Sequence, residues 1–237
     1  MDFHMIDMSL DPRGLIQLTR ALHLPINRTD DGNIVHCALG ELFQDNAPRP
    51  FSVESGSGER NFRVLAYSQL NATALQEVAN GFAPVLPHST VDWDRFRSKP
   101  MPSKFPVGMR FRFEMEACPI VRKSNGPEVD AFLAECWKVG DDVAVDRGEV
   151  YCKWMRANLE RRGARALNVS MERFALERMI RRTHGSTRKA KTIKRPSTTL
   201  TGTLEVTDGE AFKETVRKGI GRHKSFGFGM LKLRRGS

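Results

Sequence analysis

Histidines are the residues of this sequence best suited to acid and base chemistry near neutral pH. The sequence has six, which are His4, His23, His36, His88, His184 and His223. His36 lies in a segment with helical spacing of apolar residues, about 110 degrees from the centre of the apolar face. Its side chain can therefore reach a groove, and His36 is the principal candidate. By geometry alone a surface histidine without a role is the alternative, and His23 and His223 are reserve candidates.

Glycines recur in the last part of the sequence, KGIGRHKSFGFGMLKLRR. Gly219 and Gly221 can end a helix with positive φ and let a backbone approach a phosphate closely. Gly227 and Gly229 are predicted to lie on one face of a strand, which leaves a bare surface for another backbone or a base. Glycine alone is also typical of a helix C-cap followed by an edge strand. The glycines by themselves leave both interpretations open.

The charge of the chain indicates a polyanionic partner. Lys and Arg number 38 against 28 Asp and Glu, so the formal net charge is +10 and the pI is near 9.8. Residues 181–195, here called the basic run, contain seven basic residues and no acidic residue. Gly185 and Ser186 predict a turn within it, and its arginines can form forked contacts with phosphates. A solvated loop is the alternative.

The first half of the sequence predicts the elements that hold His36. The helix that carries it is expected to begin near Asp30 or Asp31 and to end near Phe43. The other expected elements are a strand at 3–8, a helix from Asp11-Pro12, strands at 49–55 and 61–68, a helix capped by Asn71 and a strand at 91–96.

The second half repeats this order after a proline-rich linker at 99–106. The expected elements are a strand at 109–116, helices from Pro127 and at 150–162, two strand-like pieces within 166–204 that flank the basic run, a strand at 200–208, a helix capped by Asp208 and a strand at 226–233. The predicted fold is therefore α+β, with two tandem ferredoxin-like (β-α-β-β-α-β) domains at 1–100 and 107–237. The first carries the candidate histidine, and the second carries the basic insertion and the glycine-rich tail.

The tail also resembles a known signature. The C-terminal pattern G-I-G-x-x-K-[SA]-x-G-x-G-[LM]-L of CRISPR RNA-processing endoribonucleases, in the RAMP superfamily, is matched by Gly219, Ile220, Gly221, Lys224, Ser225, Gly227, Gly229, Met230 and Leu231. The chain is most similar to CasE, the processing subunit of type I-E systems, and a processing subunit of type IV systems is the second alternative. Residues 105–124 are similar to the CasE segment that opens the second domain, although Cys118 stands where Asn is usual.

The resemblance implies a catalytic site on the helix with His36. Residues 32–43, GNIVHCALGELF, are similar to the CasE pattern Y-x-x-H-x-x-L, with His36 as the catalytic histidine and Leu39 as the leucine. Asn33 stands in place of the assisting tyrosine. Asn is neither an acid nor a base, although its amide can donate a hydrogen bond to a phosphate oxygen. The candidate supporting groups are Asn33, Arg28 and Lys224.

The resemblance also implies RNA binding by the basic run and the tail, since family members insert a basic element of the second domain into the RNA stem. The expected RNA-binding residues are Arg181, Arg182, Arg188, Lys189, Lys191, Lys194, Arg195, Gly219, Gly221, Arg222, His223, Lys224 and Ser225. The expected activity is cleavage of CRISPR precursor RNA within the repeat hairpin, which leaves 2′,3′-cyclic phosphate and 5′-OH ends. The protein would then stay bound to the guide RNA with other subunits of a CRISPR effector complex, in antiviral defence.

A non-catalytic RNA-hairpin-binding protein of the same fold is the alternative function, because the usual tyrosine is missing. A general nucleic-acid-binding regulator is disfavoured, since the sequence has no helix-turn-helix or zinc motif. No metal or cofactor is expected. Cys37, Cys118, Cys136 and Cys152 form no CxxC pair, so neither a disulfide nor a metal site is implied. A cytoplasmic location without membrane contact is expected, because the sequence has no long apolar stretch and no signal peptide.

Overall fold

The chain divides into two compact units. The structure, a computed structural model, describes residues 2–24, 30–54, 62–122, 126–140, 143–182 and 190–236, with only the backbone described at 179–182 and 190–192. The N-terminal unit comprises Met1–Ser103, Arg178–Lys194 and Lys224–Met230, and the C-terminal unit comprises Lys104–Glu177, Arg195–His223 and Leu231–Ser237. A single boundary between 100 and 107 therefore does not separate the units, because the end of a long hairpin and part of the tail belong to the first.

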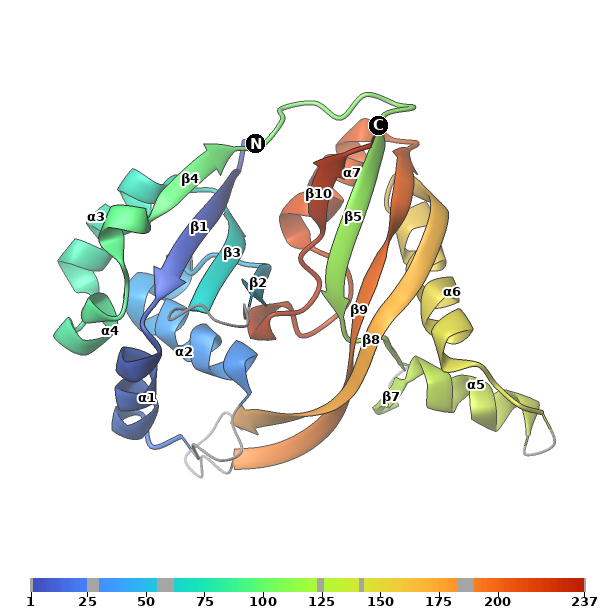
Figure 1. The fold of residues 1–237 in the computed structure, drawn as a ribbon, viewed down its shortest axis with the longest axis horizontal. Helices are drawn as coiled ribbons and strands as arrows, with labels where there is room; N and C mark the ends of the chain where they lie inside the picture. The colour runs from blue at the N-terminus through green and yellow to red at the C-terminus, as the bar shows by residue number, and fades with distance from the viewer. Residues whose placement is uncertain are drawn as a thin grey trace. The chain divides into compact units, whose positions relative to one another are not determined.

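The N-terminal unit is built on a four-stranded antiparallel sheet (Figure 1). Its elements are β1 (His4–Leu10), α1 (Pro12–Ala21), α2 (Asp31–Phe43), η2 (Gln44–Asn46), β2 (Phe51–Glu54), β3 (Phe62–Ser68), α3 (Ala72–Phe82), α4 (Val85–Ser89), η3 (Trp93–Arg95) and β4 (Arg97–Pro100). The strand order is β2-β3-β1-β4, and β1 pairs antiparallel with both β3 and β4. This order is the ferredoxin-like arrangement, so the predicted fold is confirmed for this unit.

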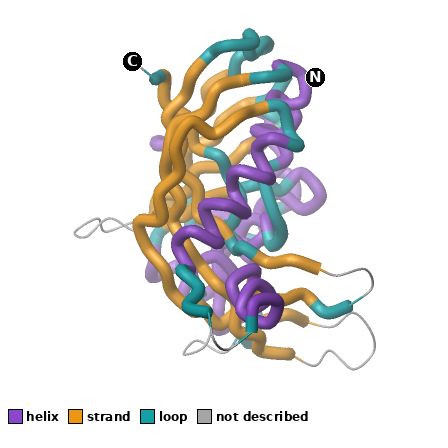
Figure 2. The backbone as a smooth tube through the Cα atoms, turned by 90° about the vertical axis from the view of Figure 1, so that its right-hand side faces the viewer, coloured by secondary structure: helices purple, strands orange, loops and turns teal. Residues whose placement is uncertain are grey.

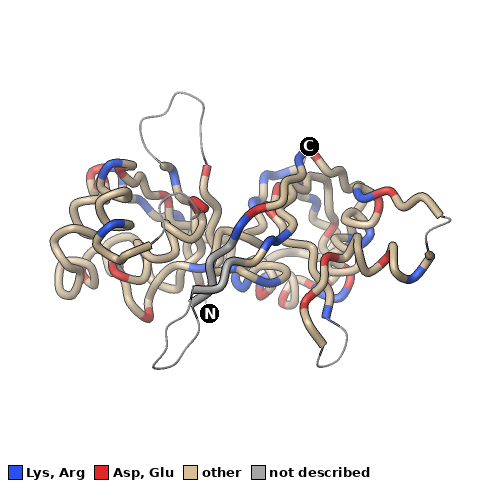
Figure 3. The backbone as a smooth tube through the Cα atoms, turned by 90° about the horizontal axis from the view of Figure 1, so that it is seen from below, with Lys and Arg blue, Asp and Glu red and all other residues tan. Residues whose placement is uncertain are grey.

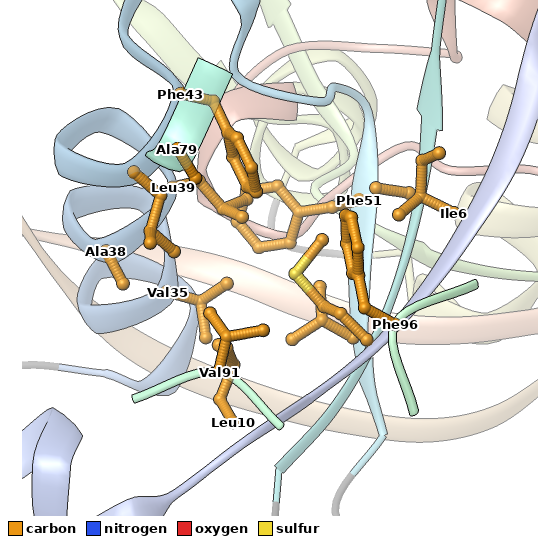
Figure 4. Packing of buried hydrophobic residues seen from close by; sticks show 14 of the residues in the cluster. Ile6, Leu10, Val35, Ala38, Leu39, Phe43, Phe51, Ala79, Val91 and Phe96 are labelled. Carbon is orange, nitrogen blue, oxygen red and sulfur yellow. The ribbon is translucent and has the colours of Figure 1, made fainter. Parts of the chain in front are cut away.

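Helix α2 packs one face against the sheet and leaves His36 on its flank. Asp30 caps the helix by accepting a hydrogen bond from the Asn33 N–H at 2.7 Å. The buried side chains of α2 recur with helical spacing and meet Ile6 and Phe51 of the sheet (Figure 4). His36 falls beside this face and is half-buried.

The strand predicted at 91–96 is wrong. Val91 makes only an isolated bridge to Leu10, residues 93–95 form the short helix η3, and β4 begins at Arg97. The Trp93 indole N–H donates to the His88 carbonyl at 3.0 Å, and the Trp93 ring packs on the rings of His88 and Phe96. These contacts turn the chain back toward α4, which an extended strand would not allow. Strand β4 also takes in Lys99 and Pro100, the start of the predicted linker.

The C-terminal unit repeats the ferredoxin-like arrangement around β5. Its elements are β5 (Arg110–Ala117), β6 (Ile120–Arg122), β7 (Glu128–Asp130), α5 (Ala131–Val139), α6 (Arg147–Glu160), β8 (Ala164–Arg182), β9 (Ala190–Val206), α7 (Gly209–Lys218) and β10 (Lys232–Arg235), with the ends of β8 and β9 in the N-terminal unit. The strand order is β10-β5-β9-β8, so β5, the first strand of this unit, lies in the interior of its sheet as β1 does in the N-terminal unit. The predicted ferredoxin-like fold is therefore confirmed for this unit as well. Figure 2 shows the strands of this unit from the side of α6. The β6–β7 pair and α5 are an insertion before α6.

The tail departs from the predicted strand at 226–233. Residues Lys224–Phe226 form the short helix η4, and β10 begins only at Lys232. Gly227 and Gly229 have φ values of 88° and 81°, which lie outside the β region. Neither glycine therefore lies on a strand face, and Gly227 lies in a turn. Between and after them, Phe228 and Met230 are buried.

The cysteines, the helices and the acidic and histidine side chains bear on disulfide, membrane and metal sites. All four cysteines lie in the described part of the chain, and none forms a disulfide. Cys118 and Cys152 are buried, whereas Cys37 and Cys136 are partly exposed. Within the ranges that the structure describes, no helix has the length and apolar character needed to cross a membrane. Over the same ranges, no group of three or more His, Cys, Asp or Glu side chains is arranged to hold a metal ion.

Candidate functional site

His36 contacts the tail. Its imidazole lies against the ring of Phe226, with the ring centroids 4.8 Å apart and the planes inclined by 50°. Burial lowers the pKa of His36 below its usual 6.5, and the positive charge of Arg49 lowers the pKa further. At neutral pH the ring is therefore uncharged, and such a ring can accept a proton.

Arg49 is a cation near His36 that the sequence analysis did not single out. Its side chain is exposed. Its backbone N–H donates to the Tyr67 carbonyl at 2.9 Å, and the Tyr67 N–H donates to the Pro50 carbonyl at 3.0 Å, which holds this residue at the start of β2. A guanidinium in this place can stabilise negative charge on a phosphate near His36. No local pattern marks Arg49, because only the packing of β2 against α2 brings the two residues together.

Two glycines allow the tail to lie against the first turn of α2. A β-carbon on Gly32 would overlap the carbonyl group of Phe226. A β-carbon on Gly227 would lie 3.5 Å from the Phe51 ring and 3.6 Å from the Gly32 Cα. The absence of a side chain at Gly32 is thus what lets the Phe226 backbone approach α2, and with it the ring that meets His36. Sequence reasoning missed Gly32, since a glycine near a helix start has no distinctive pattern.

The candidate supporting groups lie in different surroundings. Asn33 is only 4% exposed, so its amide lies inside the N-terminal unit. Lys224 and Ser225 are half-buried in η4, directly before Phe226. Arg28 lies outside the residues that the structure describes. Of the supporting groups that the structure describes, Lys224 lies on the segment that meets α2, beside the predicted RNA-binding residue Ser225.

A second group of predicted residues lies in the C-terminal unit, in the segment Gly219–His223, here called the glycine loop. Gly219 ends α7 with φ 71°, and its N–H donates to the Thr215 carbonyl at 2.8 Å. Gly221 has φ 83°, and a β-carbon there would lie 3.2 Å from the Trp154 ring. Both positions need glycine for their backbone conformation, as the sequence predicted for Gly219 and Gly221.

Three of the predicted RNA-binding residues meet at one carboxylate, Glu128. Arg195 Nη2 lies 2.8 Å from Glu128 Oε2, and Arg222 Nε lies 2.9 Å from Oε1. His223 Nε2 lies 3.3 Å from Oε2. Glu128 carries no sequence signal, because nothing in its local pattern indicates which basic residues it will pair with.

For most of the remaining residues of the basic run, the structure describes the backbone alone or neither the backbone nor the side chain. Lys194 is exposed in β9. Arg181, Arg182 and Lys191 have their backbones in β8 and β9, and their side chains lie outside the description. Arg188 and Lys189 lie wholly outside the described residues. In the part that is described, Lys and Arg occur in both units, interspersed with Asp and Glu (Figure 3).

The chain is similar to known proteins along nearly its whole length. A family model described as CRISPR associated protein matches residues 4–235. The structure of a CRISPR endoribonuclease, Cse3, bound to a 19-nucleotide RNA is 20% identical, with a TM-score of 0.65 over 98% of this chain and 99% of that chain. The CRISPR-associated protein Cas6e from Escherichia coli K-12 is 17% identical, with a TM-score of 0.59 over 98% and 99% of the two chains. A chain of a CRISPR RNA-guided surveillance complex is 18% identical, with a TM-score of 0.52 and the same coverage. No curated protein sequence matches.

Proposed function

The chain belongs to the family of CRISPR-associated proteins, and from this premise we propose that it is an endoribonuclease that cleaves CRISPR precursor RNA within the repeat hairpin. The observation that carries the proposal is the half-buried, neutral His36 in contact with Phe226 of the glycine-rich tail. Both residues lie in segments that resemble CasE in sequence. The similarity in fold to an RNA-bound endoribonuclease supports the same conclusion.

The proposed chemistry uses the RNA's own nucleophile. His36 accepts the proton of a ribose 2′-OH, and the 2′-oxygen attacks the adjacent phosphorus. The bond from phosphorus to the 5′-oxygen then breaks, which leaves a 2′,3′-cyclic phosphate on one product and, after protonation, a 5′-OH on the other. Arg49 and Lys224 supply positive charge for the phosphorane. The reaction needs no divalent metal.

The proposed RNA contacts come from the basic run, from the glycine loop and from Lys224 and Ser225 of η4. Arg and Lys side chains would bind stem phosphates, and the glycine loop would bring backbone N–H groups close to the strand. The described residues that serve this role are Lys194, Gly219, Gly221, Arg222, Lys224 and Ser225. After cleavage the protein would remain on the guide RNA as a subunit of an effector complex, as the similar chain of the surveillance complex suggests.

The deciding experiment is incubation of the purified protein with its own repeat RNA in EDTA. We expect one cut in the hairpin, with a 2′,3′-cyclic phosphate and a 5′-OH identified by mass spectrometry. An all-2′-deoxy strand of the same sequence should bind and remain intact, because it lacks the nucleophile. Tight binding of repeat RNA without cleavage, at any excess of protein, would establish the non-catalytic alternative instead.

The pH dependence should report the lowered pKa of His36. Only the neutral imidazole accepts a proton, so the rate should fall as pH decreases through this pKa. Burial and Arg49 both lower the pKa of His36. The rate should therefore rise with pH and reach a plateau above an apparent pKa that lies below 6.5. Single-turnover cleavage between about pH 5 and pH 8 measures this limb. A rate that decreases as pH rises across this interval would make His36 the proton donor.

A further inference from the structure

Three basic side chains lie around the carboxylate of Glu128 in the C-terminal unit. Arg195, Arg222 and His223 approach its two carboxylate oxygens at 2.8, 2.9 and 3.3 Å. The side chains of Glu128 and Arg195 are each 16% exposed, whereas that of Arg222 is 43% exposed. Glu128 therefore holds one inward arginine and one arginine with a surface open to a ligand.

The three partners come from segments that are distant in sequence. Arg195 ends the basic run on β9, while Arg222 and His223 end the glycine loop. One carboxylate on β7 thus joins the base of the basic hairpin to the loop after α7.

Strand β7 gives this carboxylate a rigid support. Asp130 lies two residues after Glu128, and its carboxylate accepts from Tyr151 Oη at 2.9 Å and from Arg147 Nη1 at 3.0 Å. Tyr151 is fully buried. The two carboxylates of β7 therefore bind different partners, with Asp130 anchoring the strand to α6 and Glu128 holding the loop cations.

We propose that Glu128 is a positioning residue for RNA recognition, which holds Arg222 and the glycine loop in the geometry that meets an RNA phosphate. The inference rests on the proposed function. A loop with two glycines loses much backbone entropy when it is ordered, and fixing an arginine side chain adds a further loss of rotamer freedom. An ion pair that orders both before RNA arrives removes this cost from binding. A carboxylate near a polyanion can also have the opposite role and repel phosphates. Removal of the Glu128 charge weakens hairpin binding in the first case and strengthens it in the second.

The test compares Glu128→Gln with a matched control, Glu205→Gln. Glu205 also accepts from two arginines, Arg110 and Arg165, each at 2.9 Å, and its side chain is 17% exposed. For each variant, dissociation constants are measured for the repeat hairpin and for a scrambled RNA of equal length. Glu128→Gln should weaken hairpin binding about tenfold. The affinity for scrambled RNA should stay the same or increase, because the substitution removes one negative charge. Glu205→Gln should change neither constant.

Several results would overturn the positioning role. Tighter binding of both RNAs by Glu128→Gln would make the carboxylate a repulsive group, and equal hairpin affinity would remove any role in binding. Thermal melting shows whether each variant is folded. If Glu128→Gln does not fold, Glu128→Asp keeps the charge but shortens the reach, and it should weaken hairpin binding by a smaller factor. Failure of the wild-type protein to bind its repeat hairpin would instead contradict the proposed function.

Discussion

Replacement of His36 by alanine should lower the single-turnover cleavage rate by about 10²–10⁴-fold, the usual contribution of a general base. The imidazole is uncharged at neutral pH, because burial and Arg49 lower its pKa. It therefore contributes no cation to phosphate binding, and the affinity for repeat RNA should change little. The measurement is a rate at saturating protein, together with a dissociation constant for uncleavable RNA.

His23→Ala is the matched control for this experiment. His23 lies in the same unit, just after α1, and was a reserve candidate by sequence. It should retain the wild-type rate. Full activity in His36→Ala would place the base elsewhere, and loss of activity in His23→Ala alone would identify that residue as the better candidate.

Replacement of Gly32 by alanine should lower the cleavage rate by about 10²-fold, although Gly32 has no side chain to take part in the reaction. The new β-carbon would overlap the Phe226 carbonyl group, so the tail must move away from α2. A shift of about 1 Å in the groups around a catalytic residue lowers a reaction rate by about 10²-fold. The same change should reduce the melting temperature, because Phe228 and Met230 are buried directly after the displaced segment.

Gly40→Ala is the control, since Gly40 lies on the same helix and a β-carbon there would meet nothing within 4 Å. Alanine at a helix interior position is favoured over glycine by about 0.5–1 kcal/mol, so this variant should be at least as stable as the wild type and fully active. A wild-type rate in Gly32→Ala would contradict the requirement for close contact between the tail and α2.

The sequence by itself determined most of the helices and the order of the main elements, although the predicted strands at 91–96 and 226–233 were wrong. Apolar spacing is a local property, and so are the caps, so the helices begin after Asp11, Asp30, Asn71 and Asp208 as predicted. The order of strands and helices then allowed the ferredoxin-like topology to be recognised twice. The same local periodicity indicated that His36 lies beside the buried face of its helix.

Only the tertiary structure decided which side chains meet. The sequence placed Gly227 and Gly229 on a strand, which was wrong, because both residues have positive φ in the folded tail. The Gly32–Phe226 approach, the place of Arg49 near His36 and the pairing of Glu128 with Arg195 and Arg222 each join residues from separate elements. Such pairings follow from how the helices, strands and loops pack. Neighbouring residues in sequence carry no information about them, because backbone propensity and hydrophobic period act only over a few residues.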